Sequence, residues 1–227
     1  EKTMLSPATR KVVHRSPTHS VWRLSLPYLQ SDAVEAESTL ERDFVHLAAL
    51  FYATTSIKHQ PFHLTTASGG YTPDFLVCFT DGSRCVVEVK PAALLAGYEE
   101  KLAQASEVLA QHGLHFVLAL DRHIHESGRH ENAILIRRYG KSRLDVLRQA
   151  RLAAELSQGP QSVGALKALG LTIADIAQSV CRHKVTLGPN LDLDDQQIVN
   201  VVESSPAVAK GDSHAVCFKR WLTDTTG

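Results

Sequence analysis

The segment Tyr71-Thr72-Pro73-Asp74-Phe75 is followed by Asp81-Gly82 and then by Val87-Glu88-Val89-Lys90. Written as a pattern, it is Pro-Asp, thirteen intervening residues and then Glu-x-Lys. Two carboxylates can hold Mg²⁺ against a phosphate, and an ammonium group can orient water or balance charge on a reacting phosphoryl group. Because these groups fall at the end of one expected strand and inside the next, the pattern indicates nuclease chemistry.

The two strands of this expected hairpin cover residues 72–80 and 84–90, and both are apolar on both faces, as in central strands covered by helices. Glu88 and Lys90 are two residues apart, so their side chains share a face. The other interpretation of Glu88 and Lys90 is a surface ion pair at a strand end.

The turn at Asp81-Gly82 raises a problem of register. With a two-residue loop, the numbers of paired residues would add up to 163, and Asp74 would face away from Glu88. We therefore predict a loop of odd length, a bulge, or an Asp74 that twists out of the ladder. The same shift would take Cys78 out of direct opposition to Cys85, for which reduced thiols are favoured over a disulfide.

Helices and further strands are expected around the hairpin. Apolar residues at helical spacing predict a helix over residues 38–52, and the run that ends at Gly113 predicts another over 93–112. Strands are expected at residues 59–64, as an edge strand because of Pro61, and at 115–120. This order predicts an α/β fold, with a mixed sheet flanked by helices.

Glu41 is the candidate third acid of the site, with Glu37 as the alternative one turn earlier. The competing interpretation is that Glu41 only closes a capping box with Ser38. Gln60 is expected either to support the site through a hydrogen bond or to be an exposed side chain of the edge strand. His123, His125 and His130 are interpreted as part of a solvated polar loop, since no ligand motif flanks them.

The chain is expected to divide into a basic N-terminal arm at 1–34, a nuclease domain at 35–140 and a C-terminal domain at 141–227. The arm either touches DNA or a partner or is only draped over the surface. Helices at 162–169, 172–182 and 194–203, with a strand at 215–222, predict a small, mainly helical, winged-helix-like C-terminal domain. Candidate DNA contacts are the basic residues around this boundary, namely Arg137, Arg138, Lys141 and Arg143.

The overall charge is balanced, with 24 Lys and Arg against 24 Asp and Glu. This argues against a protein that coats DNA by bulk electrostatics, because such binding needs many phosphate neutralisations. DNA would have to be bound locally or delivered by partners. No stretch approaches the length of a membrane span, so no membrane partner is expected.

From the residues, Asp74, Glu88 and the Val89 carbonyl are expected to coordinate Mg²⁺, and Glu41 to complete a second metal position if two ions bind. Lys90 would position the attacking water or offset charge in the transition state. The reaction would be metal-assisted hydrolysis of a phosphodiester bond, with Mn²⁺ able to replace Mg²⁺.

Four segments resemble, in order and spacing, the TnsA endonuclease family: Leu40–Phe44, His59–Pro61, Tyr71–Val77 and Val87–Pro91. The resemblance covers about residues 35–120 and implies a restriction-endonuclease-like core of the PD-(D/E)xK type. It implies that Glu41, Asp74, Glu88 and Lys90 are the catalytic set. Some members of the family carry Gln where this chain has Glu88, and here the acidic form is present.

The resemblance further implies an endonuclease subunit of a heteromeric transposase, which cleaves the 5′ ends of a cut-and-paste transposon. Its implied partners are double-stranded transposon-end DNA, a DDE-type transposase subunit that acts on the 3′ ends, and an AAA+ ATPase regulator bound by the C-terminal region. The implied location is the bacterial cytoplasm, at the nucleoid during action. The alternatives are a stand-alone restriction or repair nuclease of the same fold, and a non-catalytic adaptor between DNA and an ATPase.

Overall fold

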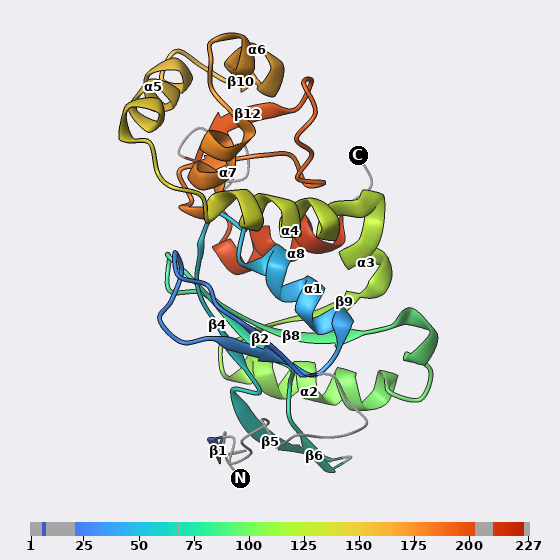
Figure 1. Cartoon of the computed structure of the whole chain (residues 1–227). Helices are drawn as coiled ribbons and strands as arrows, with labels where there is room; N and C mark the ends of the chain where they lie inside the picture. The colour runs from blue at the N-terminus through green and yellow to red at the C-terminus, as the bar shows by residue number, and fades with distance from the viewer. Residues whose placement is uncertain (1–5, 8–20, 68, 203–210, 225–227) are drawn as a thin grey trace.

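The computed structural model describes residues 6–7, 21–67, 69–202 and 211–224. At its centre lies a four-stranded sheet in the order β4-β7-β8-β9 (Figure 1). The strands are β4 (Thr54–His59), β7 (Phe75–Phe79), β8 (Arg84–Lys90) and β9 (His115–Leu120). β4 and β8 run antiparallel to β7, whereas β9 runs parallel to β8. The sheet is therefore mixed, as predicted.

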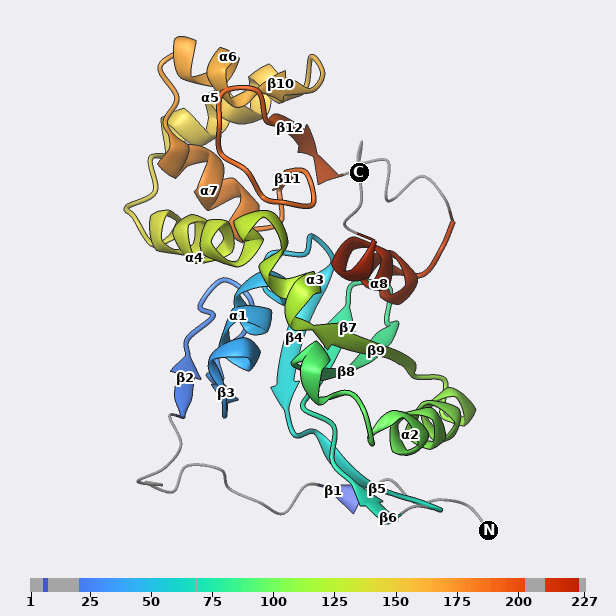
Figure 2. The ribbon, with the colours of Figure 1, turned by 90° about the vertical axis from the view of Figure 1, so that its right-hand side faces the viewer.

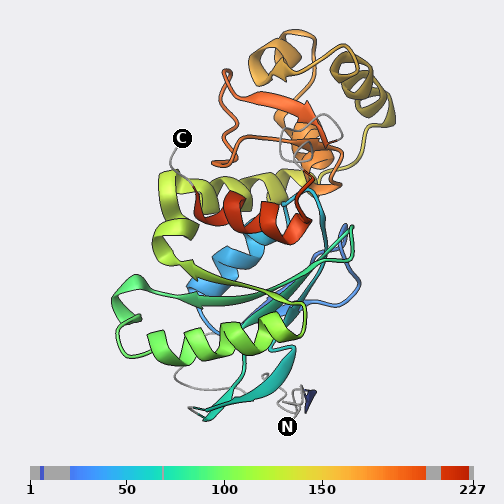
Figure 3. The same cartoon turned by 180° about the vertical axis from the view of Figure 1, so that it is seen from behind.

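Helices cover both faces of this sheet (Figure 3). On one face α2 (Glu99–Gln111) packs through Leu102 and Leu109 in a cluster that contains Val86. On the other face α1 (Thr39–Ala48) and α8 (His214–Thr223) pack in the larger core that contains Val87. The alternation of Val86 and Val87 between the two clusters follows from the pleat of β8. This mixed sheet with helices on both faces is consistent with the expected restriction-endonuclease-like core.

The hairpin between β7 and β8 has the odd-length connection that was predicted. Phe75 pairs with Val87 and Cys78 with Arg84, and the N–H of Phe79 donates to the carbonyl of Ser83 at 3.1 Å. Three residues thus form the loop, and the last of them, Gly82, has φ +80°, a value that favours glycine. The same register continued by one step sets Asp74 on the side of Glu88. Cys78 and Cys85 are not opposed, and both are free thiols.

Two small sheets flank the central one (Figure 2). β5 (Phe62–Thr66) lies between β1 (Ser6–Pro7) and β6 (Gly69–Tyr71), and β2 (Trp22–Leu24) pairs with β3 (Val34–Ala36). The prediction of a single strand at 59–64 is wrong, because this range contains the end of β4, a break and the start of β5. Gln60, with φ +39°, breaks the extended chain there. Most of the predicted basic arm, residues 1–5 and 8–20, lies outside the described residues.

The helices that flank the hairpin are shorter than predicted. α1 ends at Ala48 instead of continuing to residue 52, and the stretch 93–112 is divided into η1 (Ala92–Leu94) and α2. Gly97, with φ +90°, separates these two elements. None of the described helices has the length and apolar character needed to cross a membrane.

The polar loop that was predicted around the histidines is wrong. The segment forms α3 (Asp121–His125), η2 (Glu126–Gly128) and α4 (Arg129–Gly140). His123 stabilises the first turn of α3, since its Nδ1 accepts the N–H of Leu120 at 3.2 Å. Gly128, with φ +72°, joins α3 to α4 in a conformation that favours glycine.

The next part of the chain forms a winged-helix-like unit. Its elements are, in order, α5 (Val146–Leu156), β10 (Gln161–Ser162), α6 (Val163–Ala168), α7 (Ile173–Cys181), β11 (Val185–Thr186) and β12 (Ile198–Val201). The strands pair in the order β10-β12-β11. A short turn that contains Gly170, with φ +83°, joins α6 to α7, as in helix-turn-helix pairs.

Two expectations for this region are wrong. The helix predicted at 194–203 is strand β12, whose Ile198, Val199 and Val201 are β-branched and suit a pleated surface. The strand predicted at 215–222 is helix α8, whose first turn is capped by Ser213, since its Oγ accepts the N–H of Val216.

Two helices connect the winged-helix-like unit to the core, namely α7 within the unit and α8 after it. Residues 175–181 of α7 are all buried, and α7 packs along α4. α8 returns to the central sheet, where the Phe218 ring lies 5.3 Å from that of Phe79 and 5.2 Å from that of Phe51. The buried Arg129 donates from Nη1 to the carbonyl of Leu222 at 3.2 Å and thereby caps the end of α8. A boundary between residues 140 and 141 would thus separate α8 from the sheet on which it packs.

Candidate active site

Glu88 lies on β8 and is held at both carboxylate oxygens. Its Oε1 forms an ion pair with Lys90 Nζ at 2.6 Å, and its Oε2 accepts the hydroxyl of Tyr71 at 2.6 Å. Glu88 is 4% exposed, so both bonds act in surroundings from which water is largely excluded. The expected pairing of Glu88 with Lys90 on one face of the strand is present, with Glu88 buried and Lys90 half-buried.

Asp74 lies just before β7 and is tied to the same strand. Its Oδ2 accepts the backbone N–H of Val89 at 2.7 Å, and its carbonyl accepts the N–H of Gln60 at 2.8 Å. Val89 itself pairs with Ala119 of β9. The Asp74 carboxylate is thus fixed beside Glu88 by the backbone of the strand that carries Glu88, and the role of the Val89 carbonyl as a ligand stays a prediction.

Glu41 comes from the first turn of α1 and has capping contacts as well as a link to the other acids. Its Oε1 accepts the Ser38 hydroxyl at 3.0 Å, and its Oε2 accepts the N–H of Glu37 at 2.8 Å. Burial raises the pKa of Glu41, these two hydrogen bonds lower it, and the charges of Glu37 and Glu88 raise it. The charge of Glu88 also acts on Glu41, so the two carboxylates lie near each other, and the role of Glu41 as the third acid stays a prediction.

The carboxylates of Asp74, Glu88 and Glu41 repel one another in surroundings with little access to water. Burial, and then the charges of Glu88 and Glu41, raise the pKa of Asp74 to about 8, against the hydrogen bond from Val89 and the charge of Lys90. Burial lowers the pKa of Lys90, but the hydrogen bond and charge of Glu88 outweigh burial, so the net shift is upward. Lys90 therefore stays an ammonium group. Its single positive charge does not balance the three neighbouring carboxylates.

Gln60 lies at the edge of this group and contacts another acid. Its Nε2 donates to Glu37 Oε1 at 3.3 Å. His59, the preceding residue, has its Nε2 3.8 Å from Glu41 Oε2, and burial lowers its pKa. Glu37 and His59 thus join Glu41 and Gln60 on the side of the site formed by the end of β4 and the start of α1.

Two residues of the site were not assigned a role from the sequence. Tyr71 is the first residue of the quoted segment, but only the fold of β6 brings its hydroxyl to Glu88. Burial and the charge of Glu88 raise the pKa of Tyr71 far above its usual range, so it remains a hydrogen-bond donor. Tyr98, whose ring lies 4.8 Å from Lys90 Nζ, precedes α2. Neither contact leaves a spacing signal in the sequence.

The four basic residues considered for DNA contact differ in availability. Arg137 donates from Nη1 to His46 Nδ1 at 2.5 Å and from Nη2 to the carbonyl of Ser25 at 2.7 Å, so it joins α4 to α1. Burial and Arg137 lower the pKa of His46 to about 3, which keeps its ring neutral as the acceptor. The other three, Arg138, Lys141 and Arg143, are exposed.

The donor set suits a hard divalent cation. Asp74, Glu88 and Glu41 offer carboxylate oxygens, which are the ligands that Mg²⁺ and Mn²⁺ take in proteins. Burial and the charges of Glu88 and Glu41 raise the pKa of Asp74, and the positive charge of Lys90 offsets only part of this rise. A divalent ion would supply further positive charge, so the residues present fit such an ion.

A protein-family model described as TnsA-like endonuclease N terminal matches residues 52–121. The matched range contains Asp74, Glu88 and Lys90, whereas Glu41 precedes it. This match confirms the family resemblance found in the sequence. No curated protein matches the chain.

Proposed function

Because residues 52–121 form a TnsA-like endonuclease N-terminal domain, we propose that this chain is the endonuclease subunit of a heteromeric transposase. It cleaves the 5′ ends of a cut-and-paste transposon by hydrolysis of phosphodiester bonds. The observation that carries the proposal is the arrangement of Asp74, Glu88 and Lys90, in which Glu88 is buried, Asp74 and Lys90 are half-buried, and each charged group is held by a named partner. A surface that served only as an adaptor would not need to bury like charges together.

In the proposed mechanism, Asp74 and Glu88 hold Mg²⁺ and Glu41 contributes to the same site. When bound, the ion polarises the scissile phosphate and lowers the pKa of its bound water. Lys90, kept protonated by Glu88, orients the attacking water or offsets charge on the phosphoryl group. The hydroxyl of Tyr71 and the N–H of Val89 restrict the carboxylates of Glu88 and Asp74 to fixed orientations.

Double-stranded transposon-end DNA and a DDE-type transposase are the proposed partners for cleavage. A balanced charge of 24 basic and 24 acidic residues supports dependence on partners for DNA capture, with the exposed Arg138, Lys141 and Arg143 as local contacts. The residues after 140 are proposed to dock an AAA+ ATPase regulator through the winged-helix-like unit, while α8 holds that unit to the sheet.

The function is tested by incubating the purified chain with transposon-end DNA, with and without the transposase subunit, in Mg²⁺ or Mn²⁺. Nicks are mapped on each strand. We expect cleavage at the 5′ ends only when the partner is present, and none after chelation of the metal.

Two results would contradict the proposal, one from this cleavage experiment and one from a transposition assay of a variant. Efficient cutting of any duplex by the chain alone would indicate a stand-alone restriction or repair nuclease. Unchanged transposition with Asp74→Ala would indicate a non-catalytic adaptor between DNA and the ATPase.

The variant Tyr71→Phe is expected to need about 10–100-fold more Mg²⁺ for half-maximal cleavage, because Glu88 Oε2 loses the bond that orients it. The measurement is the cleavage rate as a function of Mg²⁺ concentration. Tyr139→Phe, at a side chain that is 41% exposed, is the matched control and should behave as wild type. Equal Mg²⁺ dependence of the two variants would show that Tyr71 does not position Glu88.

A further inference from the structure

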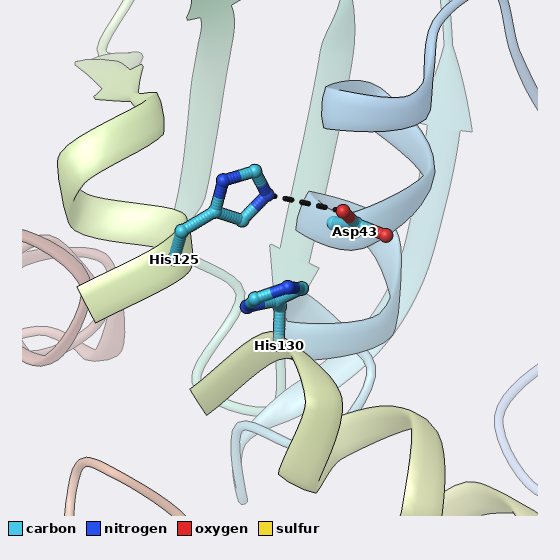
Figure 4. Close-up of side chains that lie close together, drawn as sticks. All are labelled: Asp43, His125 and His130. Carbon is cyan, nitrogen blue, oxygen red and sulfur yellow. Dashed lines mark hydrogen bonds and ion pairs between the residues drawn. The ribbon is translucent and has the colours of Figure 1, made fainter. Parts of the chain in front are cut away.

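A second group of metal-ligating side chains lies on the opposite flank of α1 from Glu41. It consists of Asp43 from α1, His125 from the end of α3 and His130 from the first turn of α4. Figure 4 shows both imidazole rings directed from their helices toward the Asp43 carboxylate. One ligand atom from each residue lies within 4.8 Å of the other two. Residues 82 positions apart in the chain, such as Asp43 and His125, are thus gathered at one point.

The hydrogen bonds around the group leave one possible ligand atom on Asp43 and one on His130. Asp43 Oδ1 accepts two bonds from the Arg42 guanidinium, at 2.9 and 2.6 Å, which leaves Oδ2 directed at His125 Nε2, 3.1 Å away. The His130 Nδ1 is buried and has no hydrogen-bond partner. A buried polar atom without a partner is costly, and a metal ion would remove that cost.

We propose that Asp43, His125 and His130 bind a first-row transition metal ion such as Zn²⁺, at a site separate from the carboxylate site for Mg²⁺. Two imidazoles and one carboxylate are a common ligand set for Zn²⁺, with ligand distances of about 2.0–2.2 Å. Ligands at that distance from one ion lie roughly 3.4 Å apart in tetrahedral geometry, so small side-chain rotations from the present arrangement suffice.

Exposure and charge around the group are compatible with such an ion. The His125 side chain is 41% exposed, so an ion can enter from solvent and a water molecule can occupy the fourth position. The Asp43 side chain is 3% exposed, and Arg42 fixes its orientation from behind, as partners of ligating carboxylates do.

The ion would join α1 to α3 and α4 at one point, in addition to the hydrogen bonds between His125 and Asp43 and between Arg137 and His46. α1 carries Glu41 two residues before Asp43, so the site would hold the helix that supplies the third acid. This role does not depend on the proposed nuclease activity, because it concerns the stability of the fold.

The test uses metal-free protein without a polyhistidine tag and titrates it with Zn²⁺ against a chromophoric chelator. Wild type is expected to bind one equivalent, and His125→Gln and His130→Gln are expected to lose on the order of a hundredfold or more in affinity. At a hundredfold excess over the dissociation constant, Zn²⁺ should raise the Tm of wild type by about 5–10 °C. Titration with Co²⁺ should give the visible absorption of a tetrahedral site.

Two controls separate this site from the other histidines and from the carboxylate site. His115→Gln removes an exposed imidazole and should retain Zn²⁺ binding, as should Glu88→Gln. Loss of Zn²⁺ binding in Glu88→Gln, with binding unchanged in His130→Gln, would show that the ion enters the nuclease site instead. Absence of binding to wild type would equally overturn the proposal.

Discussion

The variant Asp74→Asn is expected to lose DNA cleavage by at least about a thousandfold while its Tm stays at or above that of wild type. A carboxylate that holds the catalytic ion contributes several kcal/mol to transition-state stabilisation, and about 4 kcal/mol corresponds to a thousandfold in rate. The amide retains the size of the side chain and can still accept the N–H of Val89. Cleavage rates and thermal unfolding of the metal-free protein are the two measurements.

The stability of Asp74→Asn distinguishes a catalytic defect from a folding defect. In the metal-free protein, burial and the charge of Glu88 disfavour the Asp74 carboxylate, so its replacement by a neutral amide removes a repulsion. Asp32→Asn, at an exposed position, is the control and should change neither measurement. If Asp74→Asn cleaved at the wild-type rate, the assignment of the site would be wrong.

The variant Phe218→Ala is expected to lower the free energy of unfolding of the nuclease core by about 3–5 kcal/mol, as for other buried phenylalanines. Phe218 is 0% exposed, and its ring lies within 6.4 Å of the ring of Phe44 on α1. Removing it leaves a cavity between α8, α1 and the sheet. Chemical denaturation followed by the fluorescence of Trp22 and Trp221 would measure the change.

A matched control for Phe218→Ala is Leu147→Ala, because Leu147 is 83% exposed on α5. That substitution should change the free energy of unfolding by less than about 0.5 kcal/mol. The comparison also tests where the core ends. A nuclease core whose unfolding is insensitive to Phe218→Ala would mean that α8 belongs energetically to the winged-helix-like unit.

The sequence predicts the centre of the fold better than its periphery. β7 and residues 116–120 of β9 are continuous apolar runs, and such runs indicate burial directly. An odd-length loop was one of the three arrangements expected to bring Asp74 to the side of Glu88, and it is the one that the hairpin adopts. By contrast, β12 and α8 were assigned the wrong type, since short segments with mixed polarity are decided by the neighbours on which they pack.

The sequence could predict only those site residues that lie close together in the chain. Asp74, Glu88 and Lys90 lie on one hairpin, so strand geometry relates them. Tyr71 and Tyr98 reach the same group through the folding of β6 and the turn before α2, and no periodicity records those contacts. The group of Asp43, His125 and His130 was missed because its members come from three helices, two of which were taken for a loop.

The return of α8 to the central sheet makes the winged-helix-like unit an internal insertion and not an appendage. α4 leads into it and α8 follows it, and both of these helices pack on the core that contains Phe44. A load that a bound protein places on the unit would therefore be shared by two covalent tethers, which restrict swivelling more than one would. A chimera that exchanges this unit between homologous chains would likewise need two junctions, one before and one after the unit, to leave the nuclease core intact.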